Sequence, residues 1–151
     1  MGQLDKYKND FKLLLEGGFF AANQADEDAA KKCFSAAQAL QPSNTMPKVG
    51  LGYIHLLKLE LKQACGIFEE IITKEPHNEM ARALLGLSFA LTTKEVSKGE
   101  KLLLEAEKNS SDSSVKQMTQ TAIEFIDRFI KKAPTPAQGQ TAGKKKEKGS
   151  K

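Results

Sequence analysis

The sequence predicts an all-α protein built from repeated helical hairpins. Two observations lead to this fold class: residues of the same type recur at a spacing of 34, and the apolar residues between them recur at helical spacing. A fixed period of roughly 20–50 residues is the signature of a stacked repeat protein. Four columns recur in this way: Gly18, Gly52 and Gly86; Ala30 and Ala64; Phe34 and Phe68; and Pro42 and Pro76.

Each of these columns has a physical reason. A glycine inside a helix costs about 1 kcal/mol relative to alanine, so three glycines at a fixed period indicate close packing of the first helix of each hairpin on the second. The small alanines meet that close approach, and the phenylalanines fill the space beside it. Proline ends one helix and can begin the next. The recurring residues are therefore predicted to be structural.

The spacing of apolar residues places the helices in order. Leu4, Tyr7, Phe11 and Leu14 extend the first helix toward the N-terminus, and Asp112 or Ser113 is expected to cap a final helix. The final helix either covers the open end of the stack, as solenoids require, or binds a partner. The predicted helices are 3–23, 27–40, 46–58, 61–74, 77–91, 97–109 and about 113–132. The apolar face of the final helix comprises Val115, Met118, Ala122, Phe125, Ile126 and Phe129.

The third hairpin departs from the pattern. One extra residue in the 92–96 turn shifts Gly99, Leu103 and Ala106 into the alanine, phenylalanine and second alanine columns, and Ser111 replaces the proline. The sequence therefore predicts that the third hairpin is the least regular of the three.

Composition divides the 151-residue chain into a folded part, 1–133, and a tail, 134–151. The tail holds five lysines and one glutamate, which account for the whole formal net charge of +4. Because it has no large apolar residue, we expect it to be disordered, and to serve either solubility or weak contact with an acidic surface. Residues 1–133 carry equal numbers of basic and acidic side chains, so specific nucleic-acid binding is not predicted.

The sequence also bears on location. No apolar run reaches the roughly 18 residues that a membrane span needs, and the first residues lack the apolar segment of a secretory signal. Cys33 and Cys65 fall within predicted helices at no disulfide-framework spacing. We therefore expect reduced thiols, a cytoplasmic location and no membrane insertion.

Chemical motifs are sparse. The two histidines, His55 and His77, have no partner at metal-ligand spacing, and Gly50-Leu51-Gly52 lacks the third glycine of a dinucleotide fingerprint. No phosphate-binding loop or nucleophile elbow occurs. We therefore predict that the chain is not an enzyme and needs no metal or cofactor.

The four columns resemble those of the tetratricopeptide family over residues 11–111. The resemblance implies three repeats, at about 11–44, 45–78 and 79–112, with an N-terminal helical extension and a C-terminal capping helix at about 113–132. It also implies that the second, fifth, ninth and twelfth positions of each repeat line a concave groove. These positions are Lys12, Leu15, Phe19 and Ala22; Met46, Val49, Tyr53 and Leu56; and Met80, Ala83, Leu87 and Ala90.

Eleven of these twelve positions are apolar. Some family members bind a C-terminal carboxylate with lysine and asparagine at these positions, and this sequence lacks that set. The apolar positions are either core residues or a groove for an amphipathic helix. A bare apolar surface of several hundred Å² is uncommon without a partner, and methionines such as Met46 and Met80 suit a surface that adapts to a ligand.

A small chain of three such repeats with an apolar groove is similar to bacterial type III secretion chaperones, and among these it most resembles the needle-subunit chaperone of the chlamydial type. The resemblance implies that the groove holds an amphipathic helix of the needle subunit, together with a small co-chaperone, and so prevents premature polymerisation. The related chaperone of the translocator proteins and a general protein–protein interaction scaffold are the alternatives.

Overall fold

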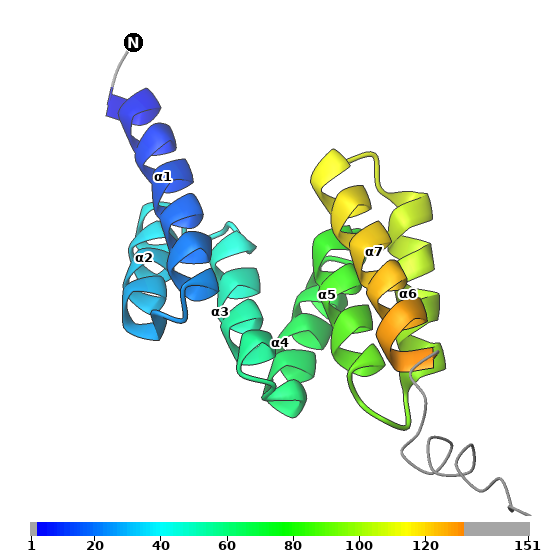
Figure 1. The fold of residues 1–151 in the computed structure, drawn as a ribbon. Coiled ribbons are helices and arrows are strands. Elements are labelled where there is room, and N and C mark those ends of the chain that lie inside the picture. Colours follow the sequence, from blue (N-terminus) through cyan, green and yellow to red (C-terminus); the bar gives the residue numbers. More distant parts are fainter. Residues whose placement is uncertain (1–2, 132–151) are drawn as a thin grey trace, which may run out of the picture.

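Seven α-helices pack as adjacent antiparallel pairs in the order in which they occur along the chain, consistent with a helical-hairpin repeat (Figure 1). The computed structural model describes residues 3–131, with side chains from Tyr7 onward; the predicted Lys-rich tail lies outside these residues. The helices are α1 (Gln3–Asn23), α2 (Glu27–Leu40), α3 (Met46–Leu57), α4 (Leu61–Lys74), α5 (Glu79–Ala90), α6 (Val96–Asn109) and α7 (Ser113–Phe125), and a π-helical segment, η1 (Ile126–Lys131), continues α7.

The predicted helices are confirmed, with small differences at their ends. α5 begins two residues later than predicted, because the side chain of Asn78 accepts a hydrogen bond from the backbone N–H of Ala81 at 3.0 Å and caps the helix. Asp112 caps α7 in the same way, accepting from the N–H of Ser114 at 2.8 Å. α3 ends at Leu57. In the turn that follows, Leu59 adopts a positive φ of 58°, and because this residue is not a glycine the sequence did not indicate such a backbone conformation.

The predicted phenylalanine columns form the centre of the core. Phe34 and Phe68 are almost fully buried, and a Cβ atom built on Gly52 would lie 2.6 Å from the ring of Phe68. Phe34 is enclosed from two sides, because a Cβ on either Gly18 or Gly50 would lie 2.5 Å from its ring. The glycines of the first helices thus provide the space that these rings occupy.

The third hairpin uses a different contact. A Cβ on Gly86 would lie 2.8 Å from the backbone carbonyl oxygen of Gly99, so the backbones of α5 and α6 themselves approach closely. Leu103 and Ala106 follow on α6 and are fully buried. The shift caused by the extra residue in the 92–96 turn therefore brings α6 into register with α5, as predicted.

Candidate protein-binding groove

Of the twelve predicted groove positions, Lys12 is exposed and Ala22 is buried; the other ten, which are the predicted binding residues, lie on the first helices of the three hairpins and divide by burial. The half-buried residues, which we call the groove, are Leu15, Phe19, Met46, Tyr53, Met80 and Leu87. The buried residues are Val49, Leu56, Ala83 and Ala90. The second group packs in the core clusters beneath the groove, so these four residues contribute support and not open surface.

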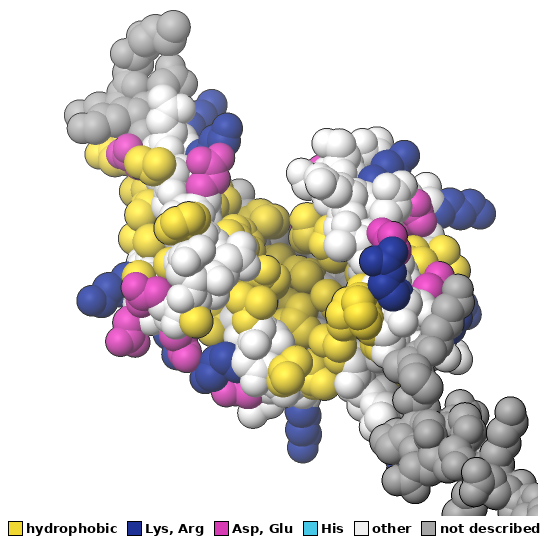
Figure 2. Space-filling model, viewed as in Figure 1, with side chains coloured by type: hydrophobic (Ala, Val, Ile, Leu, Met, Phe, Trp, Pro, Cys, Tyr) yellow, Lys and Arg dark blue, Asp and Glu magenta, His cyan; other side chains and the backbone are white. Residues whose placement is uncertain are grey.

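The groove follows the inner side of the stack. Figure 2 shows hydrophobic side chains gathered in a hollow between α1 and α7, over the central helices of the stack. Lys12, the charged member of the twelve positions, is exposed and pairs with Glu16 at 3.8 Å along the same helix. The hollow is therefore an apolar surface with its charges at the margin.

Aromatic rings form the α1 side of the groove. The ring centroids of Phe19 and Tyr53 lie 5.6 Å apart, and Phe19 meets Phe34 edge to face at 5.0 Å. The Tyr53 hydroxyl donates a hydrogen bond to Oδ1 of Asn23 at 2.6 Å, and burial raises the pKa of this hydroxyl. Tyr53, which is half-buried, thus joins the first two hairpins.

Methionine and leucine form the middle of the groove. Met80 and Leu87 on α5 each pack against the two core clusters that lie on either side of them. Met118 on α7 contacts the same two clusters and is also half-buried. Unbranched methionine side chains can change rotamer at low cost, so this surface can adapt to different apolar shapes.

Met118 was not among the predicted groove residues, because the final helix was expected to present one broad apolar face to the stack. The structure divides that face. Val115, Ala122 and Ile126 are buried against α5 and α6, whereas Phe125 and Phe129 are exposed by 41% and 58%. The width of the apolar face of the final helix was the signal available in the sequence, because this face is wider than one packing surface can bury.

Two ion pairs join neighbouring helices. Lys48 on α3 pairs with Glu70 on α4 at 2.5 Å, and this contact holds the pKa of Glu70 below its ordinary value. Lys131 pairs with Glu100 on α6 at 2.5 Å. The first pair joins the two helices of the second hairpin, and the second joins η1 to α6.

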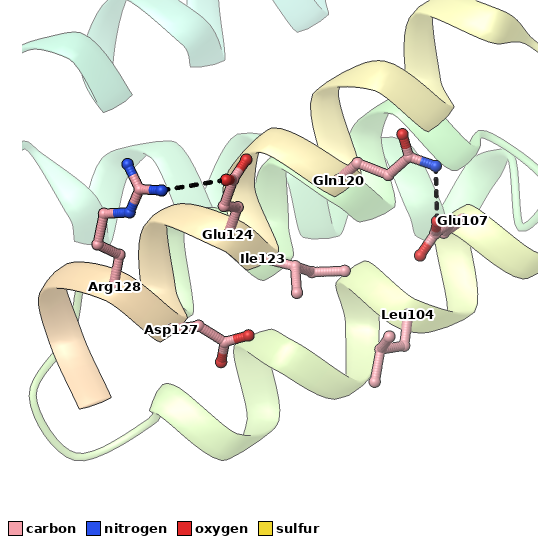
Figure 3. A pocket seen from close by; sticks show the side chains of 7 residues that line it. All are labelled: Leu104, Glu107, Gln120, Ile123, Glu124, Asp127 and Arg128. Carbon is pink, nitrogen blue, oxygen red and sulfur yellow. Dashed lines mark hydrogen bonds and ion pairs between the residues drawn. The ribbon is translucent and has the colours of Figure 1, made fainter. Parts of the chain in front are cut away.

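A separate cleft of about 490 Å³ lies between α6 and α7 (Figure 3). Leu104 and Ile123 line its apolar part. Four of its polar groups pair with one another: Gln120 donates to Glu107 at 3.1 Å, and Arg128 donates to Glu124 at 3.4 Å (Figure 3). Asp127, which also lines the cleft, pairs with Lys131 at 3.8 Å. Because the charged and amide groups of the cleft have partners in the protein, we assign no chemistry to it. 

A cluster of titratable side chains lies at the α3–α4 turn. His55 pairs with Glu60 at 2.5 Å across the α3–α4 turn, and Lys58 pairs with the same carboxylate at 2.8 Å. These two contacts, Lys58 first, lower the pKa of Glu60. Cys33 and Cys65 are free thiols.

Two features are missing from residues 3–131. No group of three or more histidine, cysteine or acidic side chains in this part of the chain could hold a metal ion. No helix there has the length and apolar character to cross a membrane. Comparison with protein-family models and with curated proteins finds no match to the chain.

Proposed function

We propose that this protein is a tetratricopeptide-type binding protein that holds an amphipathic helix of another protein in its groove. The observation that carries the proposal is a run of six half-buried apolar side chains, from Leu15 on α1 to Leu87 on α5, with no charged residue among them. Removing such a surface from water is favourable by about 25 cal/mol per Å² of apolar area, so a complementary apolar surface binds there.

The lining of the groove favours a helix over an extended segment. The groove is formed by the sides of helices, whose backbone N–H and C=O groups are bonded within each helix. An extended ligand would bury its own backbone polar groups against apolar side chains and lose their hydrogen bonds to water. A helix satisfies these groups internally and can present apolar residues at spacings of three and four to the groove.

The class of function that we propose is a cytoplasmic chaperone of the type III secretion needle subunit, acting with a small co-chaperone. Two features support this class: the glycine, alanine, phenylalanine and proline columns that recur every 34 residues, and the apolar groove. The resemblance of the sequence to these chaperones rests on the same two features. A subunit that polymerises through an amphipathic helix cannot do so while that helix is bound elsewhere, and the bound state is favoured by mass action. The chain itself would act by binding and not by catalysis.

The test is to purify the tagged full-length protein from its own cells and identify the bound client. A small helical subunit that polymerises when released is the expected client. A large client with membrane-spanning segments would favour the translocator chaperone class instead, and folded enzymes or regulators would favour a scaffold.

Two variants then connect the client to the groove. Leu87→Asp places a charge against the client, and Met80→Gln changes polarity at nearly constant size. Each should reduce the amount of bound client by about tenfold or more, because groove contacts of this kind concentrate the binding energy. Leu104→Asp, at a site 54% exposed and outside the groove, is the matched control and should retain the client. If both groove variants remain folded and keep the client, the proposed site is wrong.

A further inference from the structure

The methionine side chains that the structure describes gather on one surface. The chain has four methionines, and three of them, Met46, Met80 and Met118, lie within residues 7–131. They belong to three different helices, α3, α5 and α7. All three are half-buried, and all three pack against the core cluster that contains Phe68. Helices that are far apart in the sequence thus bring these three thioethers to the same part of the molecule.

The core beneath this surface is built from other residues. The buried members of the cluster are alanine, valine, leucine, isoleucine and phenylalanine, and no methionine within residues 7–131 is buried. Methionine is unbranched and fills irregular gaps in protein cores, so packing alone would place it inside as well as at the surface. Its restriction to partly open positions is therefore not explained by packing.

A half-buried thioether is open to a specific covalent change. Its sulfur lone pair attacks one oxygen of hydrogen peroxide, a sulfur–oxygen bond forms, the oxygen–oxygen bond breaks, and water leaves after proton transfer. The sulfur loses two electrons and the peroxide gains them. The product, methionine sulfoxide, carries a polar oxygen where the side chain was apolar, and methionine sulfoxide reductases reverse the change.

The sulfoxide has different consequences in the free and the ligand-bound protein. In the free protein the flexible side chain can turn its new oxygen toward water, because each of the three residues is half-exposed. The helices therefore keep their packing. Against an apolar ligand the same oxygen would be buried without a hydrogen-bond donor, which is costly. Oxidation should accordingly weaken binding more than it weakens the fold.

Cys65 is a second oxidisable side chain at this cluster, and it is also half-buried. Burial, and then the carboxylates of Glu69 and Glu95, raise the pKa of its thiol, which disfavours the reactive thiolate. The products differ as well. Dithiothreitol reduces a disulfide or a sulfenic acid and leaves methionine sulfoxide in place, so treatment with this reductant separates the two kinds of oxidation.

We propose that Met46, Met80 and Met118 form an oxidation site on the groove side of the protein, and that their conversion to sulfoxides closes the groove to apolar ligands until a reductase restores them. This inference rests on the proposed function, because the groove has to bind an apolar helix before oxidation can prevent it. It adds a reversible chemical control to the same surface.

The test uses the purified full-length chain, treated with hydrogen peroxide and then with dithiothreitol. Peptide mass spectrometry measures sulfoxide at each methionine, and circular dichroism measures helicity. The binding probe is a fluorescein-labelled helical peptide of about 20 residues with leucine and phenylalanine along one face, followed by fluorescence anisotropy. Full oxidation should weaken its binding by about tenfold or more at unchanged helicity, and methionine sulfoxide reductases should restore it.

Two variants assign the effect to the thioethers. The triple variant Met46→Leu, Met80→Leu, Met118→Leu keeps apolar side chains of similar volume and should bind the peptide equally well before and after peroxide treatment. It retains Met1, so oxidation of that residue is common to both samples. Cys65→Ala should lose binding on oxidation as the wild type does.

The outcomes separate this inference from the proposed function. If the untreated wild type does not bind the peptide, the proposed function fails and the inference fails with it. If the untreated protein binds and the oxidised, folded protein binds equally well, only the inference is overturned. It is also overturned if the three methionines resist peroxide until the protein unfolds, if reductases do not restore binding, or if Cys65→Ala becomes insensitive to oxidation. Rescue by reductases needs no substitution, so it decides the question even where the triple variant does not fold.

Discussion

The first two hairpins and the third hairpin place a glycine at the same position of the repeat and use it in different ways. In the first two, Gly18 and Gly52 make room for a phenylalanine ring from the second helix. In the third, Gly86 faces Gly99, and the two helix backbones come into contact. Glycine is therefore required by a neighbouring side chain in the first two hairpins and by a neighbouring backbone in the third.

The difference matters because a side chain and a helix backbone do not move aside equally easily when volume is added next to them. A phenylalanine ring can turn or shift by a few tenths of an ångström when its space is reduced, although the core around it resists. A carbonyl oxygen within a helix cannot move without displacing the helix that carries it. The third hairpin, which is irregular in sequence, should accordingly be the less tolerant of added volume.

The largest effect is expected from emptying the regular core. Phe68→Ala removes a fully buried ring next to Gly52 and should lower the free energy of unfolding by about 3–5 kcal/mol. Urea denaturation followed by circular dichroism measures the change. A loss below about 1 kcal/mol would contradict the assignment of Phe68 to the centre of the second hairpin.

A pair of glycine substitutions tests the comparison directly. Gly99→Ala adds a methyl group against the backbone of α5, so it should destabilise the protein by about 2 kcal/mol or more even after the helical preference of alanine is counted. Gly52→Ala meets the ring of Phe68 and should cost about 1 kcal/mol less than Gly99→Ala. Gly66→Ala, where nothing lies within 4 Å, is the control and should be neutral or slightly stabilising. Equal losses at Gly52 and Gly99 would remove the distinction drawn between the hairpins.

The smallest effect on stability is expected in the turn between α4 and α5. Glu75 accepts hydrogen bonds from Thr45 at 2.7 Å and Asn78 at 3.0 Å, in that order of influence, and they hold its pKa below the ordinary value. The folded-state pKa is thus the lower one, so the stabilisation is present at neutral pH and is lost as the pH falls through the folded-state pKa, below the ordinary glutamate value of about 4.3.

Glu75→Gln should therefore lower stability at pH 7 by no more than about 1 kcal/mol, since the site is partly open to solvent. The difference between variant and wild type should shrink toward pH 3, as thermal melts at both pH values would show. A constant difference across this range would mean that the ionised carboxylate does not matter. The corresponding turn after the first hairpin pairs Asn44 with Gln41, which has no such pH dependence.

The fold could be predicted from the sequence because the residues that define it have few alternatives. Only glycine admits the ring of Phe34 or Phe68 at such short distances, and a 34-residue recurrence of both partners identifies the contact. The helix ends were harder to place. Leu59 and Ala25 adopt positive φ values without being glycine, and nothing in their chemistry marks them as turn residues.

The apolar stripe that we predicted as a groove could be assigned to α1, α3 and α5 from the sequence, but the burial of its members could not be predicted. A column of the repeat fixes the side of the helix on which a residue lies, not how closely the next helix covers it. For this reason Val49 and Ala83 proved to be buried while Leu15 and Leu87 did not. The exposure of Phe125 was missed for the same reason, because Phe125 and Ile126 are neighbours in sequence and differ entirely in exposure.

The enclosure of Phe34 has a consequence for how the molecule opens. Its ring fills space left by Gly18 in the first hairpin and by Gly50 at the start of the second, so neither hairpin can separate without exposing it. In a stacked repeat, stability is the sum of each unit and its coupling to the next. The shared ring strengthens that coupling between α1, α2 and α3, and the slow-exchanging amides of these helices should be protected by one common opening instead of fraying from the N-terminal end.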